Sequence, residues 1–140
     1  MATLKYSIGI QAGGGPQLAV NQSKDVQAFD RVQVKVPADG GVGEVDVDLQ
    51  PSVATRISML FITSSLYSTP ADELKYRLSD GAGGDSAWVS LKEPQLFLGP
   101  AITLFNVTNP KLLKLKNAFT AGDATKQAVV DVFVGRNATA

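Results

Sequence analysis

The sequence predicts an all-β protein, a single-domain β-sandwich of jelly-roll-like type with little or no helix. Apolar and polar residues alternate with a period of two along most of the chain, as in strands with one buried face. Glycine, proline or asparagine interrupts the alternation at spacings of roughly 8 to 14 residues, which gives about eight to ten short, mostly antiparallel strands. A chain of 140 residues also has the length of one ordinary domain.

The N-terminal part begins with a predicted strand and continues into a glycine-rich segment. Residues 4–10 alternate tyrosine, leucine and isoleucine with polar or small residues. Three glycines and a proline follow within 11–16, and such a run does not hold a strand ladder. We therefore expect one domain over 1–140, with a flexible arm at about 11–23.

The next two alternating stretches predict a β-hairpin. Residues 31–36 (RVQVKV) and 45–49 (VDVDL) flank a turn sequence, PADGG, at 37–41. The register that pairs Lys35 with Glu44 puts the valines on one face and two opposite-charge pairs on the other. The predicted polar face consists of Arg31, Gln33, Lys35, Glu44, Asp46 and Asp48.

The three acids of that face suggest a metal site, but their spacing argues against one. On a strand, Glu44, Asp46 and Asp48 point the same way at intervals of about 6.5 to 7 Å. The oxygen ligands of one calcium ion lie about 2.3 to 2.6 Å from it, so a straight strand cannot bring all three to one ion. We predict no metal ligands here, and the face meets either water or a partner subunit.

The remaining pattern continues as strands to the C-terminal region. Residues 57–62 are almost continuously apolar, which predicts a strand in the middle of the core. Residues 69–73 resemble a helix start, but alternation at 74–78 favours a strand over a helix. Further strands are predicted at 88–92, 96–98, 102–107, 113–119 and 128–134.

Composition excludes several classes of function. The chain has no cysteine and no histidine, so thiol nucleophiles, Ser-His-Asp machinery and the usual zinc sites are ruled out. No other catalytic motif occurs, and we predict a protein that is not an enzyme and has no cofactor. Lysine and arginine balance the acids at 13 each, which disfavours nucleic acid as a partner. No apolar run predicts a membrane span, and the N-terminus lacks a signal-peptide pattern, which predicts synthesis in the cytosol.

Two functions remain. The first is a structural or interaction subunit that self-associates, for example as a trimer or ring, or binds a shell protein. Its most probable setting is a virion, as a phage capsid decoration, cement or tail accessory protein. The alternative is a module that binds carbohydrate or a surface polymer through the loops 79–87 and 118–127. Aromatic rings for such a module are Trp88, Tyr6, Tyr67 and Tyr76.

Overall fold

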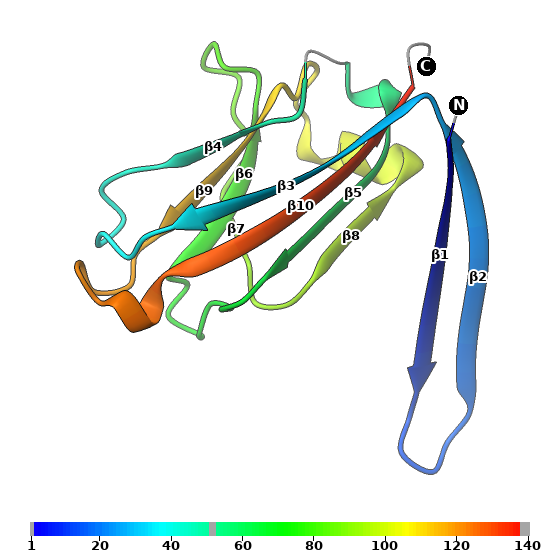
Figure 1. Cartoon of the computed structure of the whole chain (residues 1–140), viewed down its shortest axis with the longest axis horizontal. Helices are drawn as coiled ribbons and strands as arrows, with labels where there is room; N and C mark the ends of the chain where they lie inside the picture. Colours follow the sequence, from blue (N-terminus) through cyan, green and yellow to red (C-terminus); the bar gives the residue numbers. More distant parts are fainter. Residues whose placement is uncertain (1, 51–52, 138–140) are drawn as a thin grey trace.

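The computed structural model describes residues 2–50 and 53–137. It consists of a sandwich of two four-stranded antiparallel sheets and a separate two-stranded hairpin that projects from one end of the sandwich (Figure 1). One sheet has the strand order β3-β10-β5-β8, and the other has the order β4-β9-β6-β7. The predicted all-β fold class is confirmed.

Strands account for most of the described residues. They are β1 (Ala2–Gln11), β2 (Gln17–Val26), β3 (Ala28–Val36), β4 (Val45–Asp48), β5 (Ile57–Ser64), β6 (Leu74–Ser79), β7 (Val89–Ser90), β8 (Gln95–Leu98), β9 (Leu112–Asn117) and β10 (Ala128–Arg136). Short 3-10 helices lie between them, namely η1 (Ala54–Arg56), η2 (Gly99–Phe105) and η3 (Ala124–Lys126).

The eight strands of the sandwich follow the jelly-roll order. The strands pair from the outside inward along the chain, β3 with β10, β4 with β9, β5 with β8 and β6 with β7. This arrangement is one long antiparallel ribbon rolled up, and the pairs β10–β5 and β6–β9 complete the two sheets. The chain crosses between the sheets at every connection except the one between β6 and β7.

Alternating side chains of both sheets fill the core. In β10, Val130 and Val132 are fully buried, and from the opposite sheet Leu113 and Leu115 of β9 are fully buried as well. Each such side chain contributes about 1.5 to 3 kcal/mol on burial, so the valine-rich alternation that predicts the strand also drives the packing of the layers. The stretch 57–62 forms β5 between β10 and β8, which confirms the prediction of a central strand.

Asn117 ties the two sheets together at one end of the sandwich. Its side chain is buried, with 1% of the residue exposed. The amide nitrogen donates hydrogen bonds to the carbonyl oxygens of Val36 (3.0 Å) and Lys126 (2.8 Å). The amide oxygen accepts a hydrogen bond from the N–H of Phe119 (3.0 Å). Because Val36 ends β3 and Asn117 ends β9, one side chain satisfies backbone groups from both layers.

The predicted hairpin of residues 31–36 and 45–49 is wrong. The two stretches are strands, but β3 pairs with β10 and β4 pairs with β9, so they belong to different sheets. Alternation determines which side chains point inward, but it does not determine the neighbouring strand. The expected pairing of Lys35 with Glu44 therefore does not exist, and Lys35 lies opposite Val129.

Two further predictions need correction. Residues 102–107 do not form a strand, because Gly99 and Pro100 start the helix η2, which ends at Asn106 in a left-handed conformation with φ 57°. The segment 11–23 does not remain a glycine-rich loop, because β2 begins at Gln17 and pairs with β1 over ten residues. The prediction of a strand at 74–78 is confirmed by β6.

Candidate interaction surface

Three residues of the predicted polar face lie on the outer face of β3. Arg31 forms an ion pair with Asp131 of β10, with 3.1 Å between guanidinium nitrogen and carboxylate oxygen. Gln33 donates a longer hydrogen bond of 3.4 Å to the same carboxylate, and Lys35, two residues later, is the next side chain on this face. These side chains belong to the outer face of the sheet β3-β10-β5-β8.

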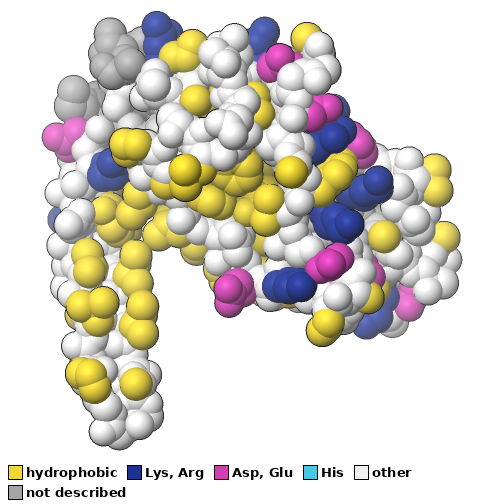
Figure 2. Space-filling model, turned by 180° about the vertical axis from the view of Figure 1, so that it is seen from behind, with side chains coloured by type: hydrophobic (Ala, Val, Ile, Leu, Met, Phe, Trp, Pro, Cys, Tyr) yellow, Lys and Arg dark blue, Asp and Glu magenta, His cyan; other side chains and the backbone are white. Residues whose placement is uncertain are grey.

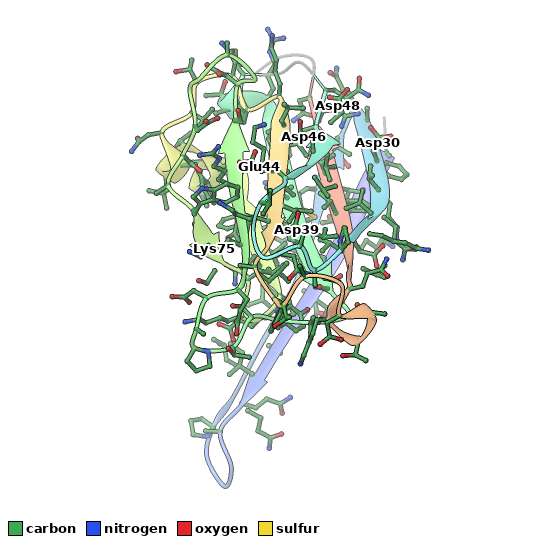
Figure 3. All side chains as sticks on the ribbon, turned by 90° about the vertical axis from the view of Figure 1, so that its left-hand side faces the viewer. Asp30, Asp39, Glu44, Asp46, Asp48 and Lys75 are labelled. Carbon is green, nitrogen blue, oxygen red and sulfur yellow. The ribbon has the colours of Figure 1, made fainter. Side chains whose placement is uncertain are left out.

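The three acids lie on the other sheet, along and before β4 (Figure 3). Glu44 contacts Arg77 at 3.4 Å and Lys114 at 3.5 Å, and Asp46 contacts Lys114 at 3.3 Å. Asp48 accepts a hydrogen bond of 2.7 Å from the N–H of Gln50. The six predicted residues therefore do not form one face, and the sandwich separates them into two clusters of local charge pairs.

The ion pairs of Lys114 on β9 with Glu44 and Asp46 hold β4 and β9 together. Burial lowers the pKa of Lys114, but hydrogen bonds and charge attraction from Asp46 and Glu44 outweigh it, and the pKa lies above its usual value. Among residues 2–50 and 53–137, no group of three or more acidic side chains is placed to hold a metal ion. Each acid of the cluster has a cationic neighbour or a backbone donor within reach.

The aromatic residues of the alternative function are scattered. Trp88 lies near two cations, with Arg77 at 4.3 Å and Lys116 at 5.3 Å from the ring centroid. Tyr76 is fully buried in the core, and Tyr6 belongs to the projecting hairpin. Tyr67 accepts a hydrogen bond from the N–H of Ser64 (3.2 Å). These four rings do not come together as one platform.

The loops of the alternative function lie at opposite ends of the sandwich. Loop 79–87 follows β6, and loop 118–127 follows β9. Since Leu74 pairs with Asn117 and Ser79 pairs with Leu112, the two strands run in opposite directions and their loops leave at opposite ends. The loops are separated by the strand length of about 17 Å, so they do not form one binding site.

The hairpin β1-β2, which we call the arm, has one apolar and one polar face. Side chains at paired positions of β1 and β2 point to the same face, so the register determines which residues make up each face of the arm. The distal half of the apolar face is open, with Ile10 60% and Leu18 63% exposed. On the polar face, Thr3 donates to Asp25 (2.8 Å). The apolar residues of this face are Leu4, Tyr6, Ile8, Ile10, Leu18 and Val20, and toward the base Gln22 and Lys24 share the face.

The arm is also nearly free of charge. Its residues 2–26 contain only Lys5, Lys24 and Asp25 as charged residues, out of 26 in the chain, and 6–23 contain none. A water-exposed edge strand usually carries lysine or other charges that prevent pairing with further strands. Figure 2 shows hydrophobic side chains along the arm and on the part of the sandwich that it overhangs. The absence of charged residues from 6–23 is visible in the sequence, and this absence is the signal that marks the arm as an interaction element.

The base of the arm is fixed to the outer face of the sheet β3-β10-β5-β8. At Gly135, a Cβ atom would lie 2.9 Å from Cδ1 of Leu4 and 3.3 Å from Cγ1 of Val26, so any larger residue would push these two side chains away from β10. The backbone N–H of Gln27 donates to the carbonyl oxygen of Arg136 (3.0 Å), which joins the arm to the end of β10. The arm is therefore held at its base and stands free at its tip (Figure 1).

A groove of about 400 Å³ lies between the arm and this sheet. Its walls are Tyr6 and Ile8 of the arm and aromatic or aliphatic side chains of the sheet. Phe29 stacks on Phe133 with ring centroids 5.7 Å apart and is 50% exposed. The sheet wall consists of Met59, Phe61, Leu96 and Phe133.

The sheet wall changes from apolar to polar with distance from the base of the arm. The register places Gly135 beside Met59, Phe133 beside Phe61, and Asp131 beside Thr63 and Gln33. The groove-lining residues of the first two rows are therefore aromatic or aliphatic, with Arg31 opposite Phe133 at the β3 end of the second row, and the third row is polar. The groove is apolar at its closed end and polar at its mouth.

Comparisons with known proteins give no independent guide to function. No family model matches the chain, and no curated protein matches it. Among the described residues, no helix combines the length and apolar character that a membrane crossing requires. The functional argument therefore rests on the arm and the groove.

Proposed function

We propose that the protein is a non-enzymatic structural subunit of a larger assembly and that it joins neighbouring subunits through the arm. The observation that carries this proposal is the combination of an apolar face and an uncharged tip on a hairpin that stands away from its own sandwich. The proposed setting is a virion, in which the protein decorates or cements a capsid or belongs to the tail.

The energetics of the arm favour a partner. An isolated two-stranded hairpin is marginally stable in water, because it has no second layer against which to bury its apolar face. The distal residues Ile10 and Leu18 leave most of their surface in water. Burying an aliphatic side chain contributes about 1.5 to 3 kcal/mol, so covering this tip contributes several kcal/mol to association. A partner therefore stabilises both the contact and the arm itself.

The fold is compatible with the proposed setting but does not decide it. Jelly rolls occur both in viral capsid proteins and in lectins, so this fold accommodates an assembly subunit and a carbohydrate-binding module. The arm favours assembly. The carbohydrate alternative loses support because the loops 79–87 and 118–127 leave opposite ends of the sandwich, and because Arg77 and Lys116 flank the ring of Trp88.

Sedimentation velocity and light scattering over a range of concentrations test this proposal. We expect a discrete oligomer for the natural chain and dissociation when both Ile10→Asp and Leu18→Asp are introduced on the apolar face. The control combines Val42→Asp and Leu104→Asp, which replace aliphatic side chains that are 90% and 80% exposed and lie outside the arm and the groove. A natural chain that stays monomeric at every concentration would contradict self-assembly through the arm.

A further inference from the structure

We propose that the occupant of the groove is the arm of a second copy of this chain, and that two copies exchange arms around a two-fold axis. This inference rests on the proposed function, since it names the partner and the geometry of the arm-mediated contact. Each arm enters the groove of the other copy with its tip toward the closed end. Its apolar face packs on the apolar face of the other arm, and its polar face covers the sheet wall.

The two apolar faces match each other in an antiparallel arrangement. A two-fold axis places the tip of one arm beside the base of the other, so Ile10 and Leu18 pack near Leu4 of the partner copy. In the middle of the arm, Ile8 packs near Tyr6. Because residues 6–23 carry no charge, this contact brings no like charges together at the tips.

The polar face of the entering arm matches the sheet wall step by step. Its distal part contains the pair Gly9 and Ala19, whose small side chains leave room for the phenyl rings at the closed end. Its proximal part contains Lys5 and Asp25, which approach the mouth, where Asp131 and its ion-pair partner Arg31 supply both charges. Small residues thus meet large rings, and each charged residue of the polar face meets an opposite charge on the sheet.

The area needed for a stable dimer favours exchange over a simple contact between arms. A ribbon of two strands is about 10 Å wide, and ten residues span about 33 Å, so one face of the arm covers about 300 Å². Contact between the two apolar faces alone is well below the roughly 800 Å² that each partner contributes to a typical stable interface. In the exchanged dimer, each copy covers three such surfaces, both faces of its arm and its sheet wall, or about 900 Å². Of these two arrangements, only the exchanged dimer reaches the required area.

Site-directed cross-linking tests the geometry, and the absence of native cysteine makes the background clean. One variant carries Ala19→Cys on the polar face of the arm, and the other carries Leu96→Cys on the sheet wall, beside Phe61. Both are mixed, left to exchange subunits and treated with a short bismaleimide. We expect a covalent dimer that contains one copy of each variant. The control pair combines Ala19→Cys with Lys75→Cys on the outer face of the other sheet and gives no such dimer (Figure 3).

The outcomes separate this inference from the proposed function. An oligomer in light scattering without the link between positions 19 and 96 overturns arm exchange and leaves assembly through the arm intact. A link between Ile8→Cys variants without the link between positions 19 and 96 shows contact of the arms alone and also overturns the exchange. A monomer at all concentrations overturns both. Equal thermal unfolding of the variants and the natural chain confirms that the substitutions leave the fold unchanged.

Discussion

Replacing Asn117 by alanine should cost the protein a large part of its stability. The substitution removes two donated hydrogen bonds and one accepted hydrogen bond. The carbonyl oxygen of Val36 and the N–H of Phe119 are buried and lose their partners, and each such group costs about 1 to 3 kcal/mol. The carbonyl of Lys126 is partly buried and can turn to water. We expect a loss of about 3 to 5 kcal/mol, out of the roughly 5 to 15 kcal/mol of a typical domain.

Urea unfolding followed by the fluorescence of Trp88, the single tryptophan, measures this loss. With a slope of about 2 kcal/mol per molar urea, the midpoint should fall by about 2 M. Asn117→Asp has nearly the natural size but lacks both donors, so we expect it to be as destabilising as alanine at neutral pH. The control is Asn21→Ala on the exposed arm, which should cost less than about 0.5 kcal/mol. A loss below about 1 kcal/mol for Asn117→Ala would refute the role of this amide in joining the sheets.

Three further predictions concern the arm and the dependence of stability on pH. Gly135→Val should clash with Leu4 and Val26 and loosen the base of the arm, so amide hydrogen exchange in β1 and β2 becomes faster; unchanged exchange would contradict the fixed base. Hydrogen bonds from backbone N–H groups of the loop that follows Asp80 lower the pKa of its carboxyl group below the usual 3.8. The ionised carboxylate therefore stabilises the fold at pH values above 3.8, and this stabilisation is lost as the pH falls through the lowered pKa. Asp80→Asn should therefore lose less stability in acid than the natural chain, and parallel curves of urea midpoint against pH would argue against this. Burial disfavours the ionised phenolate and raises the pKa of Tyr76 from 10.0 to about 12. The difference in stability that this shift produces, about 3 kcal/mol, is fully present below pH 10, where the hydroxyl is neutral, and is lost as the pH rises through 12. Tyr76→Phe should flatten this alkaline loss in circular dichroism, whereas an equally steep loss would count against a buried, neutral tyrosine.

The sequence predicts faces better than it predicts neighbours. The alternation in 31–36 correctly places Val32 and Val34 toward the core, because a buried face needs apolar residues at every second position. It does not reveal that the partner of this strand begins at Ala128. A local hairpin is the simplest interpretation of two neighbouring strands, but in a rolled ribbon of eight strands only β6 and β7 are paired neighbours along the chain.

An arm was predicted at about 11–23, but its second strand, β2, was missed for a different physical reason. The side chains of β2 that share the apolar face include Gln22 and Lys24, because this part of the hairpin covers no core. Without regular alternation, the glycines of 11–16 suggest a loop, although they only provide the turn. The prediction of a polar contact face at Arg31 and Gln33 stays a prediction; Arg31 lies opposite Phe133, and Gln33 lies opposite Asp131 in the polar row.

The central position of β10 imposes an order on folding. During synthesis β3 and β5 leave the ribosome before β10 exists, and they cannot pair with each other because β10 separates them in the finished sheet. A nascent chain that ends before Ala128 therefore has two strands without their shared partner, and the close contact of Gly135 with the base of the arm is missing as well. Pairing over such sequence distances is slow. The arm thus acquires its fixed base only when β10 is in place, so any contact that needs a fixed arm has to wait for the complete chain.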